Sequence, residues 1–157
     1  IRENLLYGKP NASEERMLEV SKAVGLNEFV QELIDGYESR VGTGGLKLST
    51  GIQQKIGVAR ALLSEPLILI ADEATASLDP ESAEMINDAI WGAMENRTCI
   101  MVVHRVLMAR PADTVLVMRD GQVEEAGSHE KLLTKPEGLY RRLFAQQYGR
   151  DRLPPAG

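Results

Sequence analysis

Two adjacent carboxylates, Asp72 and Glu73, are the residues of this 157-residue sequence whose position most clearly suggests chemistry. They follow the apolar run 67–71, which predicts a strand buried on both faces, as in parallel sheets. Open α/β sheets place ligands at the carboxyl ends of such strands. Nucleotide hydrolysis needs a metal ion that bridges phosphates and a group that orients the attacking water. We therefore expect Asp72 to act on the magnesium side of an ATP site, through a metal-bound water, and Glu73 to serve as general base.

Two further residues are candidates for the same site. His104 follows a second apolar run, 99–103, and parallel strands joined by a crossover end at the same sheet edge. There, His104 could hold a γ-phosphate oxygen and position Glu73. Ser49 lies at the expected start of a helix, where free backbone N–H groups can bind an anion. Each pattern alone also fits a structural role, because serine is an ordinary helix cap and short motifs often match by chance.

The elements around these residues follow from local signals. A helix is expected from near Ser49 to Leu63, and Asp79 with Pro80 predicts the capped start of a helix between the two strands. Further on, the sequence predicts a strand at 114–118, a hairpin turn at 120–121, a return strand at 122–126, and two helical segments from the cap Ser128 to about Tyr148. His129 and Trp91 are expected to have structural roles.

The first 45 residues predict helices and loops without a strand. Ser13 is a candidate N-cap of a helix that stops near Gly25. Asn27 is a candidate cap of a second short helix, ended by Gly36, that packs through Phe29, Val30, Leu33 and Ile34. The glycine-rich stretch 40–46 lacks the Lys-Ser/Thr ending of a phosphate-binding loop, which favours a flexible connection.

The composition excludes several classes of protein. Hydrophobic residues make up 43% of the chain and charged residues 26%, which suits a single globular domain. The net charge of −5 gives no support for a nucleic-acid surface. No apolar run approaches the roughly 20 residues of a membrane span, and no signal peptide is evident. The single cysteine, Cys99, favours a small buried thiol in a reducing compartment.

Taken together, these residues resemble the nucleotide-binding domain of exporter-type ATP-binding cassette (ABC) transporters. The segment 67–73 resembles the Walker B strand, 76–79 the D-loop, and 103–105 the switch histidine. The segment 48–55 resembles the signature sequence LSGGQ and the residues after it. The segments 1–8 and 36–45 look like the helical subdomain of the exporters, so the likeness extends to about Tyr148.

The resemblance implies an α/β fold in which a P-loop ATPase core, a parallel sheet flanked by helices, is joined to the ABC helical subdomain. Residues 1–47 would be part of that subdomain, 48–65 the signature helix, 66–148 the C-terminal half of the core, and 149–157 a tail. The last five residues, Leu153–Gly157, are expected to be frayed.

The resemblance also assigns roles. Glu73 and His104 would be catalytic and Asp72 would bind Mg²⁺. The residues expected to contact ATP are Ser49, Thr50, Gly51, Gln54 and Asp79. Two such domains would meet head to tail around two ATP molecules, each site taking its signature serine and glycine from the opposite domain. The other partners would be transmembrane domains, and the location the cytoplasmic face of a membrane; nucleic acid is not expected.

Three departures from the family pattern qualify this assignment. Walker A, the stacking aromatic and the glutamine loop are absent and would precede Ile1, so we expect a piece of a longer protein that has no ATPase turnover on its own. Thr50 and Ile52 stand where the signature has a glycine and a glutamine, which would affect the partner's nucleotide. Thr43 replaces a glutamate in the loop that faces the coupling helices.

These departures leave two functions open. The chain is either the C-terminal part of a catalytic exporter ATPase or a truncated, degenerate cassette that pairs with a complete partner and regulates it. The retained Glu73 and His104 favour the enzyme, whereas the altered signature favours the module. A soluble ABC protein of DNA repair or chromosome structure is disfavoured by the exporter-like first fifty residues.

Overall fold

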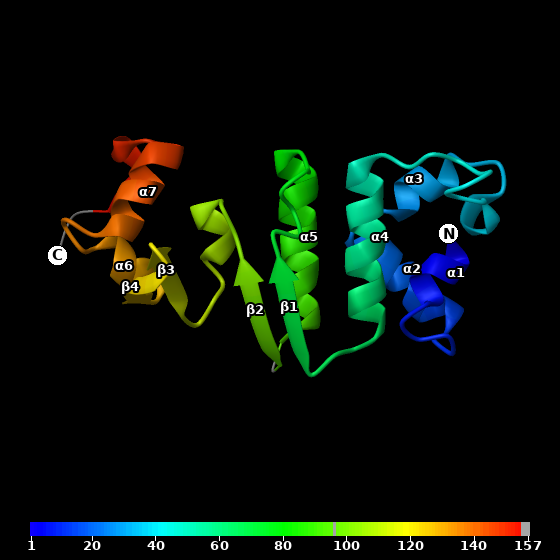
Figure 1. Cartoon of the computed structure of the whole chain (residues 1–157), viewed down its shortest axis with the longest axis horizontal. Helices are drawn as coiled ribbons and strands as arrows, with labels where there is room; N and C mark the ends of the chain where they lie inside the picture. Colours follow the sequence, from blue (N-terminus) through cyan, green and yellow to red (C-terminus); the bar gives the residue numbers. More distant parts are fainter. Residues whose placement is uncertain (96, 155–157) are drawn as a thin grey trace. The chain divides into compact units, whose positions relative to one another are not determined.

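The computed structural model describes residues 1–95 and 97–154 (Figure 1). These described residues fall into two compact units, which divide between Val102 and Val103. The first unit contains α1 (Arg2–Leu6), α2 (Glu14–Ala23), α3 (Asn27–Gln31), η1 (Gly36–Glu38), α4 (Thr50–Leu63), β1 (Ile68–Asp72), α5 (Pro80–Ala93) and β2 (Thr98–Val102). The second contains η2 (Val106–Ala109), β3 (Val115–Arg119), β4 (Gln122–Gly127), α6 (His129–Leu133), α7 (Leu139–Tyr148) and η3 (Arg150–Arg152). No helix of these described residues is long and apolar enough to cross a membrane.

The two longest helices begin where the sequence predicts. Ser49 Oγ accepts a hydrogen bond from the Ile52 N–H at 3.3 Å and so caps α4. Asp79 Oδ1 accepts from the Ser82 N–H at 2.9 Å and caps α5, in which Pro80 occupies the first turn. These local signals suffice because a cap needs only a partner three residues away.

Helix packing forms the core of the first unit. Helices α1, α2 and α5 contact α4 or one another, and the short helices gather beside α4 (Figure 1). Fully buried side chains at this packing include Leu5, Met17, Leu63, Ile86 and Ile90. Each contributes about 1.5–3 kcal/mol of transfer free energy when removed from water.

The first half of the chain departs from prediction around α3. The helix ends at Gln31 instead of running to Gly36, and Ile34, expected to pack, is fully exposed. Asn27 does not cap the helix; its Oδ1 accepts a hydrogen bond from the Tyr37 hydroxyl at 3.0 Å. The Asn27 side chain therefore bonds to a residue of another segment and does not cap its own helix, which is the role that an asparagine at this position suggests.

The glycine-rich stretch 40–46 is a closed turn rather than an open connection. The Leu46 N–H donates to the Arg40 carbonyl at 2.8 Å, and the Gly42 N–H donates back to the Leu46 carbonyl at 3.2 Å. A Cβ on Gly45 would lie 2.4 Å from the Arg40 carbonyl oxygen, so this position accepts only glycine.

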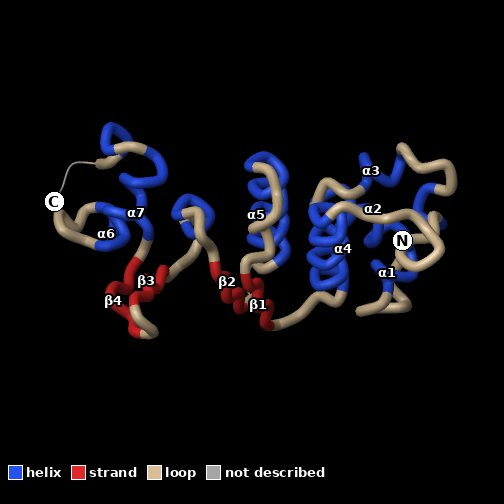
Figure 2. Tube along the Cα trace, turned by 45° about the horizontal axis from the view of Figure 1, so that its top comes forward, coloured by secondary structure: helices blue, strands red, loops and turns tan. Residues whose placement is uncertain are grey.

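The sheet of the first unit has two parallel strands, with Ile70 opposite Ile100, joined by the α5 crossover (Figure 2). The alternate residues Leu69, Ala71, Cys99 and Met101 are wholly or partly buried. The other face is open, with Ile70 69% and Ile100 52% exposed. The prediction that the first strand is buried on both faces is therefore wrong, because side-chain burial on the second face needs a layer that these residues do not supply.

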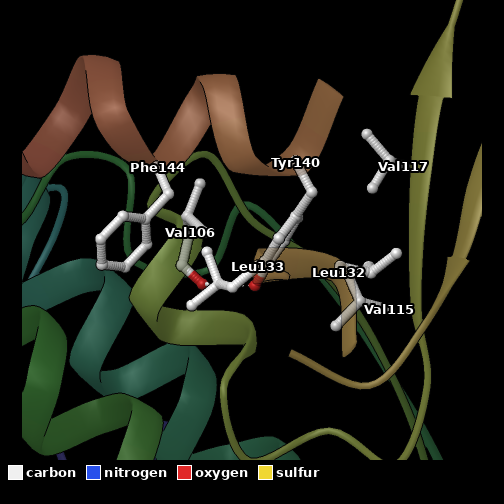
Figure 3. Packing of buried hydrophobic residues seen from close by; sticks show 7 residues of the cluster. All are labelled: Val106, Val115, Val117, Leu132, Leu133, Tyr140 and Phe144. Atoms are coloured by element: carbon white, nitrogen blue, oxygen red, sulfur yellow. Dashed lines mark hydrogen bonds between the residues drawn. The ribbon is translucent and has the colours of Figure 1, made fainter. Parts of the chain in front are cut away.

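The second unit is a β-hairpin packed with helices. Strands β3 and β4 pair antiparallel through the turn at Asp120 and Gly121, as the sequence predicts. Ser128 caps α6 by accepting from the Lys131 N–H at 3.3 Å. Figure 3 shows the core of this unit, which consists of Val106, Val115, Val117, Leu132, Leu133, Tyr140 and Phe144.

The expected fraying of Leu153–Gly157 is wrong for Leu153 and Pro154, the two of these residues that the structure describes. Helix η3 covers Arg150–Arg152, Leu153 packs against the core of the second unit, and the Pro154 carbonyl accepts from Arg141 Nη1 at 2.9 Å. The rest of that expectation concerns 155–157, which lie outside the described residues.

Candidate functional site

Glu73 lies one residue beyond β1 and has an unusual backbone conformation. Its N–H donates to the Val102 carbonyl at 3.1 Å, so the ladder with β2 continues to this residue. Its φ is +49°, in the left-handed region that residues with a Cβ rarely adopt, and its carbonyl accepts from the Ala76 N–H at 3.0 Å. Such conformations cost on the order of 1–3 kcal/mol and cluster at functional sites. The chain thus turns sharply at the carboxylate singled out as the general base.

Asp72 is the last residue of β1, opposite Val102, and its side chain is exposed. Within the described residues, no three histidine, cysteine or acidic side chains gather closely enough to hold a metal ion. Magnesium commonly uses one or two carboxylates and takes its other ligands from water and phosphate. Asp72 therefore fits an ion that arrives with a nucleotide rather than one caged by protein.

The start of α4 presents backbone donors. The Ser49 side chain and carbonyl accept from the N–H groups of Ile52 and Gln53, at 3.3 and 3.0 Å. Helix geometry leaves the N–H groups of Thr50 and Gly51 without an acceptor inside the helix. Such groups, together with the helix dipole, favour an anion. Ser49 and Thr50 are exposed, so this end of α4 is open to a ligand.

The signature segment and the D-loop segment are in direct contact. Gln54 Nε2 reaches Ser77 Oγ at 3.5 Å, and Gln54 Oε1 is buried without a hydrogen-bond partner. A Cβ on Gly51 would lie 3.2 Å from Leu78 Cδ2, so the start of α4 packs closely on this loop. The structure thus brings the two motifs together, while a nucleotide contact for Gln54 stays a prediction.

Asp79 has a structural task at the end of the same loop. Its carboxylate accepts the Ser82 backbone N–H, and this bond lowers the pKa of the Asp79 carboxyl below its usual range. The charge also lies at the positive end of α5. A contact between Asp79 and ATP remains a prediction.

His104 belongs to the second unit, whereas Glu73 belongs to the first. That the two side chains meet at one edge therefore stays a prediction. Within the second unit, a side chain of α7 fixes the His104 backbone: the His104 carbonyl accepts a hydrogen bond from Gln147 Nε2 at 2.6 Å. The segment after β2 is thus attached to α7, the last long helix.

Sequence reasoning missed the residues that make these contacts. Ser77 lies within the D-loop segment 76–79 but was given no role of its own, and Gln147 is a single polar side chain in a helix without a motif. Their partners lie 23 and 43 residues away. No periodicity or short motif marks such a pair. His129, by contrast, was expected to be structural and is: it is buried, and its Nδ1 lies 2.8 Å from the Tyr140 hydroxyl.

Known proteins resemble this chain closely. A model of the ABC transporter family matches residues 1–76. ABC transporter B family member 14 of Arabidopsis thaliana is 41% identical over 147 residues, covering 94% of this chain and 12% of that protein. The uncharacterized ABC transporter ATP-binding protein YknV of Bacillus subtilis (strain 168) is 43% identical over 148 residues, covering 94% of this chain and 24% of that protein.

A solved structure of an ABC exporter also resembles this chain. The bacterial Atm1-family ABC exporter with ATP bound matches at a TM-score of 0.83 and 36% identity, covering 93% of this chain and 26% of that one. The chain therefore spans about a quarter or less of the length of these relatives. The predicted family and the P-loop α/β fold class are confirmed: the chain belongs to the ABC transporter family, as part of the ATP-binding domain of its exporter type.

Proposed function

We propose that this chain supplies the hydrolytic carboxylates and the signature helix of an ATPase domain that powers export across a membrane. The observation that carries the proposal is the backbone of Glu73, which leaves β1 in the left-handed conformation directly after Asp72. This arrangement puts two exposed carboxylates at the carboxyl end of a strand in a parallel sheet, where α/β folds bind ligands.

Each of these residues has a proposed role in ATP hydrolysis that follows from its chemistry. A magnesium ion, when bound with ATP, neutralises phosphate charge. The Asp72 carboxylate would help to hold that ion, and Glu73 would take a proton from the attacking water. The N–H groups of Thr50 and Gly51 and the Ser49 hydroxyl donate to a γ-phosphate carried by the opposite domain. His104 holds a γ-phosphate oxygen in its own domain.

The proposed partners are a second ATP-binding domain, arranged head to tail, and transmembrane domains. The location is then the cytoplasmic face of a membrane, and the regions 1–47, 48–65 and 66–148 divide into helical subdomain, signature helix and ATPase core. The exporter neighbour with ATP bound supports the nucleotide, and the names of the relatives support the transporter.

The test is ATP turnover of this chain joined to a phosphate-loop half from a close relative. Glu73→Gln should lower kcat by about 10²- to 10⁴-fold, because it removes a general base but keeps the size of the side chain. Glu84→Gln, which changes an exposed carboxylate on α5, should leave kcat unchanged. The 157-residue chain alone should release no phosphate from ATP.

The alternative is a non-catalytic cassette that regulates a complete partner. The observation in its favour is the pair Thr50 and Ile52 at the start of α4, which adds bulk and removes an amide where the family binds phosphate. Turnover in the joined domain that does not depend on Glu73, or no turnover at all, would favour this second function.

A further inference from the structure

The segment that follows β2 is held by one side chain from the last long helix. Gln147 Nε2 donates to the His104 carbonyl at 2.6 Å, and Gln147 Oε1 accepts from the Val106 N–H at 2.9 Å. The carboxamide therefore bridges two backbone groups on either side of Arg105. All four residues lie in the second compact unit.

The chemistry of the bridge is specific to a carboxamide. The carbonyl needs a donor and the N–H needs an acceptor, and only one orientation of the amide satisfies both. A carboxylate would satisfy the Val106 N–H but would set a negative oxygen against the His104 carbonyl. Alanine would satisfy neither. The neighbouring Gln146, also exposed on α7, has the same side chain without this bridge.

A second side chain of α7 fixes the other side of Val106. The Tyr140 hydroxyl donates to the Val106 carbonyl at 3.3 Å, and Phe144 packs in the same cluster (Figure 3). Tyr140 and Gln147 are seven residues apart, two helical turns, and so lie on one face of α7. Val106 thus has both of its backbone groups bonded to α7, and its side chain is buried.

We propose that Gln147 is a positioning residue for His104. Its carboxamide sets the backbone from which the histidine side chain projects, and through it α7 controls the orientation of the imidazole toward the γ-phosphate. This inference rests on the proposed role of His104 in ATP hydrolysis. It adds a residue that lies outside every motif by which the family resemblance was drawn.

The test compares Gln147→Ala, Gln147→Glu and the matched control Gln146→Ala in the joined ATPase domain. Gln147→Ala should lower kcat on the order of tenfold, with the KM for ATP changed less than about twofold, because the reacting geometry is disturbed more than binding. Gln146→Ala should match the unmodified domain.

Gln147→Glu gives a second measurement, the pH dependence of kcat, which should not change if Gln147 has only a general structural role. A protonated carboxyl can donate to the His104 carbonyl and accept from Val106, whereas the carboxylate cannot donate. The ratio of its kcat to that of the unmodified domain should therefore rise as pH falls toward the pKa of the new carboxyl. The same ratio for Gln147→Ala should stay flat with pH.

The outcomes separate the two proposals. Unmodified kcat in Gln147→Ala, or an equal loss in Gln146→Ala, overturns the positioning role alone. So does a pH-independent ratio for Gln147→Glu. Absence of Glu73-dependent turnover in the unmodified joined domain overturns the proposed function, and the positioning role with it.

Discussion

At the scale of single residues, Ser49 has two separable tasks. Its hydroxyl caps α4 by accepting a hydrogen bond from the Ile52 N–H. We also propose that the same hydroxyl donates a hydrogen bond to the γ-phosphate of ATP. We expect Ser49→Ala to lower the free energy of unfolding by about 1 kcal/mol, the usual cost of a lost cap, and also to lower ATP turnover. Urea unfolding and phosphate release measure the two effects.

Ser13 provides the matched control, because it caps α2 in the same way, accepting from the Arg16 N–H at 3.2 Å. Ser13→Ala should cost a similar free energy and leave turnover in place. A Ser49→Ala domain that is destabilised but fully active would contradict the phosphate role.

At the scale of elements, the contact between α6 and α7 makes the second unit sensitive to acid. Burial lowers the pKa of His129 below its usual 6.5. The unfolded state therefore binds a proton at a pH where the folded state does not, so stability falls as pH falls below about 6.5. Glu130 opposes this pKa shift and Arg110 adds to it.

We expect His129→Gln to remove this acid slope while lowering stability at neutral pH, since its hydrogen bond to Tyr140 is altered. Amide exchange at Phe144 and Leu132, both buried, measures the second unit between pH 7 and 5. Trp91 fluorescence reports the first unit and serves as control, because its transition should not respond to this substitution. An unchanged slope at Phe144 would contradict the assignment to His129.

At the scale of the whole molecule, the open face of the β1–β2 sheet exposes apolar side chains to water. Ile68, Ile70, Ile100 and Val102 are all exposed there. Contiguous apolar surface of this kind promotes association and binds hydrophobic dyes. The chain alone should therefore bind such a dye and self-associate.

The double substitution Ile70→Thr and Ile100→Thr should reduce both dye fluorescence and the apparent mass in sedimentation. Because the two side chains are exposed, folding stability should change by only about 0.5 kcal/mol. Ile34→Thr, at an exposed isoleucine on α3's trailing loop, is the control and should leave dye binding as it was. Equal dye binding in all three proteins would argue against this face.

A structural feature of this chain could be predicted from the sequence when the residues that produce it are close together in the chain. The caps Ser13, Ser49, Asp79 and Ser128 were all predicted, since a cap and its partner lie three residues apart. The strands and the Asp72–Glu73 pair were placed within one residue, because an apolar run ends where the polar turn begins.

The predictions that failed, and the contacts that were missed, depend on residues far apart in the sequence. Asn27 was assigned to a cap, but its partner Tyr37 lies ten residues away. Burial of Ile70 depends on layers that no local pattern reports. Gln147 meets His104 across 43 residues, and glutamine on a helix is otherwise an ordinary surface residue. Nonlocal polar contacts of this kind cannot be read from spacing.

The Gln147 bridge has a consequence for how shortened sequences are judged. A chain that stops just before Gln147 would keep the strand carboxylates, the signature helix and the histidine, and a motif search would score it as intact. It would nevertheless lack the amide that holds the His104 and Val106 backbone. For this chain, a complete set of motifs therefore does not by itself ensure that the segment carrying His104 is held in place; the final long helix is also needed.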